Sequence, residues 1–340
     1  MTMDNPFLDE NDEPWQRQHT AEQRTEIQRR KDAGELLPGH KRRRSTYSRR
    51  DLTPIDFRLM RHIGVHKGCS SRIGGVLLSV TERTAHRRLL GLRELRLVDR
   101  HAVPGCRMFW YLTPKGKDLL VMAGAATEDD LTVGRPDAFD LAAMGHTLAV
   151  SMTAAQLSVK AADPEQLIGE TAIRRAWIRA SEPFAPKKEM YGKGYAGEQL
   201  KRAVLLKLKE GQLTWEHAMA STPALWTLTA RLEQPMTMMQ FHHPDFVVDC
   251  EAGRSGARPQ SIAVEVELST KKDSEYERIL RTYAKDPFVY RQVIWVVRSA
   301  AMRTKIQQAA VKVGLPPERL DFDLLRGADG EAFTGFPWTL

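Results

Sequence analysis

Apolar residues recur with helical spacing in three consecutive segments after residue 50. The first begins at Thr53-Pro54, where an N-cap threonine precedes a proline at the first helical position. The second begins at Ser70-Ser71, and the third begins at Thr81 and covers residues 82–95. The apolar positions of these segments are Phe57, Met60, Ile63, Ile73, Val76, Leu77, Ala85, Leu89 and Leu92. This spacing predicts three helices in close succession.

Two strands and a further helix are predicted next. Residues 97–100 and 107–112 are rich in β-prone side chains, and Pro104-Gly105 between them indicates a turn. Thr113-Pro114 then indicates the start of a helix over residues 115–122. Three helices, a hairpin and a last helix in this order are typical of a winged helix-turn-helix domain. We therefore predict such a domain over residues 51–124.

The outward face of the third predicted helix is basic. A recognition helix contacts DNA bases with side chains of its first turns, and phosphate contacts from neighbouring elements fix its orientation. The predicted DNA contacts are Arg83, Thr84, His86, Arg87 and Arg88 from the helix, with Arg100 and Arg107 from the hairpin. The alternatives are an ordinary solvated helix face and a winged helix that contacts only other proteins.

Residues 1–50 hold few apolar side chains and change from acidic to basic along the segment. The basic part includes the run Lys41-Arg42-Arg43-Arg44. Such a segment buries too little apolar surface to offset its ordering entropy, so we expect a flexible tail. The tail either favours solubility or, through Arg42, Arg43 and Arg44, lies along DNA phosphates as a basic arm.

A linker over residues 125–138 is predicted to join the first domain to a second one over residues 139–340. In the second domain, residues 246–248, 262–268 and 293–297 are β-prone, whereas 273–285 and 303–313 show helical periodicity. The run 293–297 is apolar on both faces, as in a sheet covered by helices. We expect a mixed sheet flanked by helices, and hence a two-domain α/β (α+β) chain.

Acidic side chains in the second domain have the spacing of a candidate metal site. Side chains alternate along a strand, so Glu265 and Glu267 occupy one face, and Lys271 follows them. If the strand after Asp245 is a neighbour, three carboxylates converge, and Mg²⁺ or Mn²⁺ prefers such oxygen ligands. Metal-bound water then supplies a nucleophile, and lysine stabilises charge on a phosphate. The alternative is simple alternation on a half-exposed strand.

Histidines near these acids have plainer interpretations. His146 is interpreted as a buried histidine with its hydrogen bonds satisfied, and Trp177 as a core tryptophan. His242 and His243 are adjacent, and adjacent strand residues point to opposite faces, so the pair makes a poor chelate.

The succession Pro-Asp, Glu-x-Glu, lysine, amphipathic helix and buried strand resembles the PD-(D/E)xK nuclease-like superfamily. Over residues 50–300 the chain also resembles the replication-relaxation protein family of plasmids and other mobile elements, which joins a winged helix to such a domain. The motifs that carry the resemblance are the winged-helix segment, Gly145-His146-Thr147-Leu148, Glu170 with Arg174-Arg175-Ala176-Trp177, His243-Pro244-Asp245, residues 263–268, Lys271 and Tyr276.

This resemblance implies that Asp245 and Glu265 are the metal ligands and that Glu170 is an additional acid on a helix. In one respect the sequence departs from the superfamily pattern, because Glu267 stands where a lysine is usual. Some restriction endonucleases of the superfamily use Glu-x-Glu, and Lys271, four residues further along, is the candidate replacement for the lysine.

Composition indicates which kind of binding partner and which cellular compartment to expect. The net charge of +8 favours a polyanionic partner, and double-stranded DNA, RNA and an anionic membrane surface all qualify. The three cysteines, Cys69, Cys106 and Cys250, are far apart and odd in number, which suits a reducing compartment better than a disulfide framework. The sequence shows no secretory signal and no apolar run long enough to span a bilayer. We therefore expect a cytoplasmic protein with no membrane partner.

Two functions follow from these observations. In the first, a homodimeric DNA-binding protein of a plasmid or other mobile element acts in replication, DNA relaxation or transfer, or transcriptional control. It needs no cofactor, and replication or conjugation proteins are candidate partners. In the second, the protein is an Mg²⁺- or Mn²⁺-dependent DNA endonuclease or nickase. Its candidate catalytic residues are Asp245, Glu265, Glu267, Lys271 and Glu170.

Overall fold

The computed structural model describes residues 52–102, 108–134, 141–160, 166–181, 203–204, 206–214, 228–231, 239–249, 261–285 and 290–331. Every described residue belongs to one compact unit, Asp51–Leu340. The predicted basic arm with Arg42, Arg43 and Arg44 lies outside the described residues, and so does Arg107 of the predicted hairpin turn.

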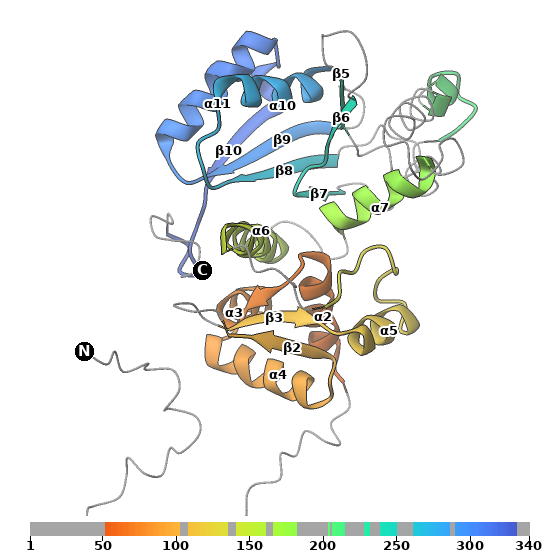
Figure 1. Cartoon of the computed structure of the whole chain (residues 1–340), viewed down its shortest axis with the longest axis vertical. Helices are drawn as coiled ribbons and strands as arrows, with labels where there is room; N and C mark the ends of the chain where they lie inside the picture. Colours follow the sequence, from red (N-terminus) through yellow and green to blue (C-terminus); the bar gives the residue numbers. More distant parts are fainter. Residues whose placement is uncertain are drawn as a thin grey trace, which may run out of the picture. The chain divides into compact units, whose positions relative to one another are not determined.

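Residues 52–134, which we call the N-terminal module, combine short helices with a small antiparallel sheet (Figure 1). In chain order its elements are α2 (Pro54–Val65), β1 (Cys69–Ser70), α3 (Ser71–Leu78), α4 (Glu82–Glu94), β2 (Val98–His101), β3 (Phe109–Leu112) and α5 (Pro114–Met122). The strand order is β1-β3-β2, and both pairings are antiparallel. The short strand β1 was not predicted from the sequence, because two residues carry too little periodicity.

Each helix of the module begins at a residue that caps it. The side chains of Ser70, Thr81 and Thr113 accept hydrogen bonds from the first-turn backbone N–H groups of α3, α4 and α5. At α2, the carboxylate of Asp56 accepts a hydrogen bond from the backbone N–H of Thr53, at 3.0 Å. Such caps satisfy backbone N–H groups that have no partner inside the helix, and they explain why the predicted helix starts were correct.

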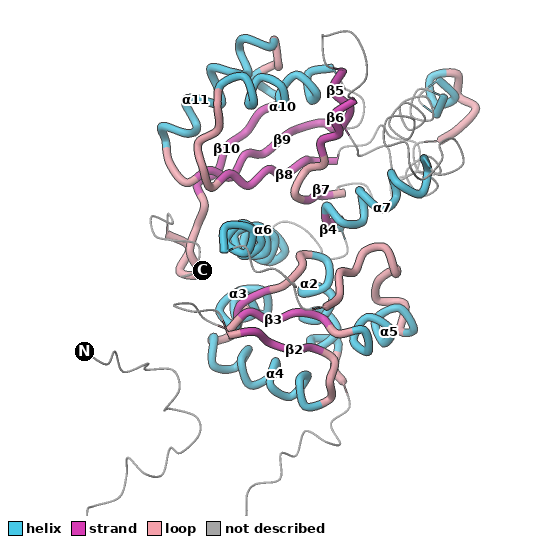
Figure 2. The backbone as a smooth tube through the Cα atoms, in the orientation of Figure 1, coloured by secondary structure: helices cyan, strands magenta, loops and turns pink. Residues whose placement is uncertain are grey.

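The remaining described elements form a mixed sheet with helices on both faces, as Figure 2 shows. They are α6 (Leu141–Lys160), β4 (Leu167–Gly169), α7 (Glu170–Ser181), β5 (Leu228–Arg231), β6 (Met239–His242), β7 (Phe246–Val248), β8 (Ser261–Glu267), α10 (Asp273–Lys285), β9 (Tyr290–Val297), α11 (Ala300–Val313), the 3₁₀ helix η6 (Pro317–Arg319) and β10 (Leu320–Leu324). The five-stranded sheet has the order β10-β9-β8-β7-β4, and β5 pairs separately with β6.

Strand direction changes in the middle of the five-stranded sheet. β8, β9 and β10 are parallel to one another, whereas β7 is antiparallel to both β8 and β4. Helix α10 connects the parallel strands β8 and β9, and α11 with η6 connects β9 to β10. The predicted mixed α/β class is therefore confirmed.

Each face of the sheet has its own apolar core. On the α10 and α11 side, Ala263, Val293 and Trp295 pack with residues of both helices. On the α6 side, Val264 and Val266 belong to a cluster that also includes residues of α6 and of the N-terminal module. The module and the sheet therefore share one core through α6. Within the described residues, no helix is both long and apolar enough to cross a membrane.

Candidate functional site

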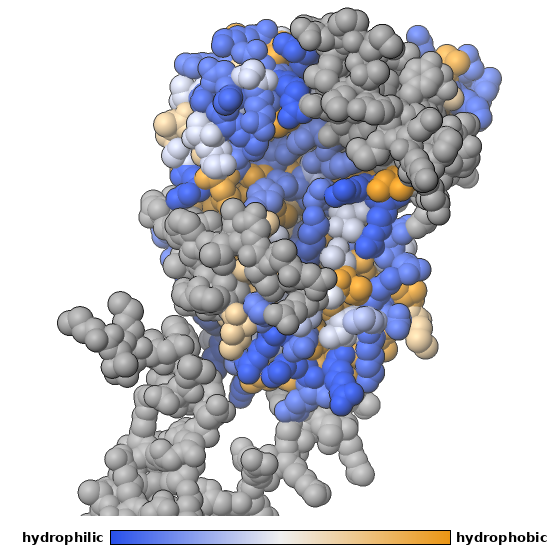
Figure 3. Space-filling model, viewed as in Figure 1, coloured by the Kyte–Doolittle hydropathy of each residue, from blue (hydrophilic) through white to orange (hydrophobic). Residues whose placement is uncertain are grey.

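The first turns of α4 present two arginines to solvent. Arg83 and Arg87 are exposed and lie one turn apart, and among the described residues neither guanidinium has a hydrogen-bond or ion-pair partner. Thr84 is half-buried, and its hydroxyl lies 3.0 Å from that of the capping residue Thr81. Figure 3 shows both hydrophilic and apolar residues on the part of the surface that contains α4.

Arg88 is placed differently from its two neighbours. Its Nη1 lies 3.1 Å from Oδ1 of Asp56 in α2, and the exposed fractions of the two side chains are 19% and 8%. The other oxygen of Asp56 accepts hydrogen bonds from the backbone and the hydroxyl of Thr53. Arg88 thus ties α4 to the start of α2, and this contact competes with the DNA contact predicted for it from the sequence.

Trp110 in β3 lies at the junction of α3, α4 and the hairpin. Its indole N–H donates to the Ser71 hydroxyl at 3.0 Å, and the same hydroxyl lies 3.0 Å from Nδ1 of His86. The His86 ring stacks edge-on against the indole, with centroids 5.8 Å apart. On β2, Arg100 is directly opposite Trp110, and its guanidinium carbon lies 5.8 Å from the indole centroid.

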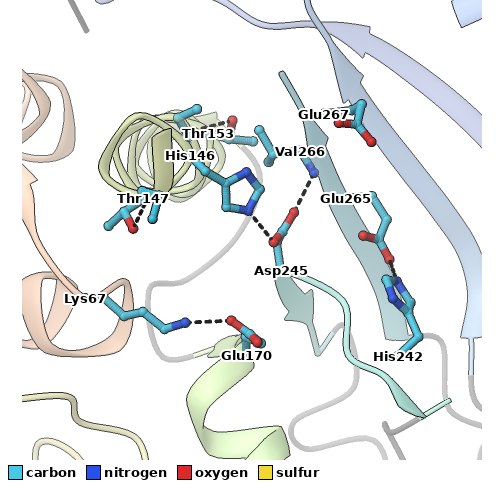
Figure 4. A network of polar contacts seen from close by, with 12 residues as sticks. Lys67, His146, Thr147, Thr153, Glu170, His242, Asp245, Glu265, Val266 and Glu267 are labelled. Atoms are coloured by element: carbon cyan, nitrogen blue, oxygen red, sulfur yellow. Dashed lines mark hydrogen bonds and ion pairs between the residues drawn. The ribbon is translucent and has the colours of Figure 1, made fainter. Parts of the chain in front are cut away.

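The predicted acids lie just before β7, on the adjacent strand β8 and at the start of α7, as Figure 4 shows. Asp245 immediately precedes β7, and one of its oxygens accepts a hydrogen bond from the backbone N–H of Val266 at 2.7 Å. Its other oxygen lies 2.8 Å from Nε2 of His146 on α6. Burial lowers the pKa of His146, but the hydrogen bond to Asp245 and the nearby charge of Glu267 outweigh burial and raise it.

Glu265 is buried on the α10 side of the sheet. Its Oε1 lies 2.6 Å from Nε2 of His242, and it also accepts a hydrogen bond from the Tyr283 hydroxyl of α10. Burial lowers the pKa of His242, yet the charges of Glu265 and Asp245 raise it above its ordinary value. Burial raises the pKa of Tyr283, and the Glu265 charge adds to this effect, so the phenol stays protonated as a donor.

Glu267 and Glu170 each have a lysine partner. Glu267 is buried and pairs with Lys271, and it also accepts a hydrogen bond from the backbone N–H of Ser269 at 3.3 Å. Burial raises the pKa of Glu267, although Lys271 opposes the rise. Glu170, at the start of α7, lies 2.6 Å from the Lys67 ammonium of the N-terminal module. The four predicted acids are thus neighbours, but each is bound to a different basic group.

A divalent cation does not fit these residues as they are arranged. Mg²⁺ requires near-octahedral oxygen ligands, usually one or two carboxylates that are free to bind it together with several waters. Asp245 and Glu265 instead bind His146 and His242, and Glu267 binds Lys271. Among the described residues, no group of three or more histidine, cysteine, aspartate or glutamate side chains is arranged to hold a metal ion.

Buried histidines connect the N-terminal module to the sheet region. Nε2 of His62 in α2 lies 2.9 Å from the Ser151 hydroxyl of α6, and burial lowers the pKa of His62 to about 3. His66, which follows α2, packs edge-on against Phe246 of β7. Burial also lowers the pKa of His66, so both imidazoles are neutral parts of the core.

Several of these partners could not be predicted from the sequence. His146 was interpreted as a buried, satisfied histidine, but its side chain is 42% exposed and binds Asp245. Trp177 lies in α7, but the placement of its side chain is outside what the structure describes. Lys67 and Tyr283 come from segments distant in sequence, so spacing alone gave no signal for them.

Comparisons with protein-family models, with curated proteins and with solved structures found no match for this chain.

Proposed function

We propose that this protein binds double-stranded DNA, with the N-terminal module acting as a winged helix. In this interpretation α4 is the recognition helix that enters the major groove, and the β2–β3 hairpin is the wing. Arg83 and Arg87 are the main contacts from α4, and Arg100 contributes from the hairpin.

The order of elements supports this proposal. Three helices and a three-stranded antiparallel sheet follow one another as α2-β1-α3-α4-β2-β3, and β1 pairs with β3 rather than with its chain neighbour. A winged helix is expected to have this order, in which the hairpin follows directly after the recognition helix. Strand β2 follows α4 in the chain, and both Arg100 of β2 and His86 of α4 contact the Trp110 ring. The hairpin therefore lies beside the first half of α4.

The main support for the proposal comes from two exposed arginines of α4. Arg83 and Arg87 are exposed, one turn apart and without a partner among the described residues. Elsewhere on α4, Arg88 pairs with Asp56 and Arg93 with Asp99. Guanidinium groups that have no protein partner are available to bind phosphates or guanine edges.

The wider role rests on the resemblance to the replication-relaxation family. We propose that the protein acts on a plasmid or other mobile element, in replication, DNA relaxation or transfer, or transcriptional control. A homodimer fits this role, because paired recognition helices read two half-sites on a duplex. Replication or conjugation proteins are the further partners that this role implies.

The test of DNA binding uses fluorescence anisotropy with a labelled mixed-sequence duplex at several salt concentrations. The double variant Arg83→Ala/Arg87→Ala is expected to bind about tenfold more weakly or worse. The plot of log affinity against log salt is expected to become less steep by about two, because each lost phosphate contact reduces the steepness by about one.

A matched control removes two positive charges from another surface. Lys285→Ala/Lys312→Ala changes two exposed lysines of α10 and α11, of which Lys312 makes only a surface ion pair with Glu277. This control should bind as the unaltered protein does. Equal weakening in both double variants would indicate a general charge effect and would remove α4 as the reading helix.

An alternative function, a Mg²⁺- or Mn²⁺-dependent endonuclease or nickase, has one observation in its favour. Asp245 immediately precedes β7, which pairs antiparallel with the β8 strand that carries Glu265-Val266-Glu267, and β8 continues through α10 into the parallel strand β9. That succession is the one expected for the PD-(D/E)xK nuclease-like superfamily. The pairing of each acid with a base is the observation against it.

Incubation with supercoiled plasmid, with and without Mg²⁺ or Mn²⁺, separates the two functions. Intact plasmid with retarded mobility is expected if the protein only binds DNA. Metal-dependent nicking that disappears in the Asp245→Asn/Glu265→Gln variant would instead establish the endonuclease.

A further inference from the structure

His86 is the one predicted DNA contact whose hydrogen bonding within the protein restricts its protonation. Its Nδ1 lies 3.0 Å from the Ser71 hydroxyl, which also accepts the indole N–H of Trp110 at 3.0 Å. An indole nitrogen only donates, so the Ser71 oxygen must be the acceptor in that contact. The Ser71 hydroxyl still has its own hydrogen to donate.

The acceptor for that hydrogen follows by elimination among the described residues. Ser71 is 6% exposed, and its only other hydrogen-bond partner among them is Nδ1 of His86. Because buried hydroxyl groups are nearly always satisfied, Ser71 donates to Nδ1. A neutral imidazole with an acceptor at Nδ1 carries its hydrogen on Nε2.

The surroundings of His86 also favour the neutral ring. Burial lowers the pKa of His86, and the positive charge of Arg100 lowers it further, more than Glu82 raises it. The nitrogen Nε2 has no hydrogen-bond partner among the described residues, and the ring is half-buried rather than buried. His86 lies three residues after Arg83 and one before Arg87, in the first half of α4.

We propose that the chain Trp110–Ser71–His86 fixes His86 as a neutral imidazole whose Nε2–H donates a hydrogen bond to an acceptor on the bound duplex. This inference rests on the proposed DNA binding. The acceptor is either a base edge in the major groove, such as a purine N7, or a phosphate oxygen. Such a donor recognises its acceptor differently from an arginine, because it presents a single hydrogen in one direction and carries no charge.

The protein half of the proposal is tested without DNA. Nitrogen-15 NMR of histidine-labelled protein at neutral pH should show His86 with a protonated Nε2 and an unprotonated Nδ1. In Ser71→Ala the hydroxyl is lost, so the same resonances should move toward a mixture of tautomers. A ring protonated at Nδ1, or a charged ring at neutral pH, would overturn the proposal.

The DNA half uses selection from a duplex library with a randomised central segment, followed by anisotropy on the selected duplex. His86→Phe keeps an aromatic ring against Trp110 but has no donor, and His86→Gln restores an N–H donor. We expect His86→Phe to weaken binding about tenfold, within the range for one base contact, and His86→Gln to recover part of the loss.

The outcome identifies the acceptor. Relaxed preference at one base position in His86→Phe indicates a base edge, whereas equal weakening on all sequences indicates a phosphate. Unchanged affinity and unchanged preference in His86→Phe would overturn the proposed contact. If the unaltered protein binds no duplex at all, the proposed function fails, while the NMR result still decides the tautomer.

Discussion

Gly169 of β4 lies directly against Val65, the last residue of α2. A Cβ atom added at Gly169 would come within 2.6 Å of the Val65 carbonyl oxygen and 3.0 Å of its Cγ1. β4 is an edge strand of the five-stranded sheet, so the N-terminal module packs at this edge by direct backbone contact.

Gly169→Ala is therefore expected to destabilise the whole folded unit. Overpacking against a backbone carbonyl cannot be relieved by a change of rotamer, and such substitutions cost about 1–3 kcal/mol. Thermal unfolding measures the effect. Gly74→Ala serves as the control, because a Cβ there meets only side-chain carbons at 3.4 Å or beyond. Equal unfolding temperatures for the two variants would mean that the module does not press on β4.

Arg88 and Arg87 are adjacent, but substitution of Arg88 should mainly lower stability, whereas substitution of Arg87 should mainly weaken DNA binding. Arg88→Ala leaves the buried carboxylate of Asp56 without its ion-pair partner, and we expect a loss of about 1–3 kcal/mol in the free energy of unfolding. Arg87→Ala changes an exposed side chain and should alter stability by less than about 0.5 kcal/mol while weakening DNA binding. Urea unfolding and anisotropy on the same samples separate the two effects, and a stable Arg88→Ala variant would contradict the assignment.

The helices of the N-terminal module could be predicted because local signals agree with the fold. Thr53, Thr81 and Thr113 cap helices where the sequence placed their starts, and the apolar positions of α4 are buried as their spacing required. Strands β1 and β4 could not be predicted, because each is very short and forms only by pairing with a distant strand. Long-range pairing leaves little trace in local periodicity.

The candidate site was predictable in part for a similar reason. Alternation placed Glu265 and Glu267 on one face of β8, and the strand after Asp245 is indeed a neighbour. Lys271 follows Glu267 by four residues and was a candidate from the sequence. His146 and His242, which bind Asp245 and Glu265, come from α6 and β6, and nothing in the local pattern marks them as partners. The same holds for Arg88, whose pairing with Asp56 depends on how α2 crosses α4.

His62 should make the protein sensitive to acid. Its pKa is lowered by burial from 6.5 to about 3, so in acid the unfolded chain takes up a proton that the folded protein does not. The stability that His62 contributes is therefore present above pH 6.5 and is lost as the pH falls toward 3. His62→Gln keeps a polar partner for Ser151 but has no proton to gain. Chemical unfolding at a series of pH values should show a smaller loss in this variant, and parallel curves would contradict the assignment.

Lys271 should stabilise the fold through Glu267 rather than act as an independent charge. Lys271→Met leaves a buried carboxylate without its counter-charge, because the Glu267 side chain is 4% exposed. We expect a loss of about 2 kcal/mol at neutral pH, below the value for a fully buried pair because Lys271 itself is 32% exposed.

The double variant Glu267→Gln/Lys271→Met removes both charges and should recover most of that loss, since no unpaired ion is left in the core. A double-mutant cycle of urea unfolding at neutral pH measures the coupling between the two residues. Recovery in the double variant would show that Lys271 neutralises Glu267 in the folded protein. If Lys271→Met alone unfolds as the unaltered protein does, Glu267 does not depend on this lysine, and the metal-free interpretation of the acids loses one of its supports.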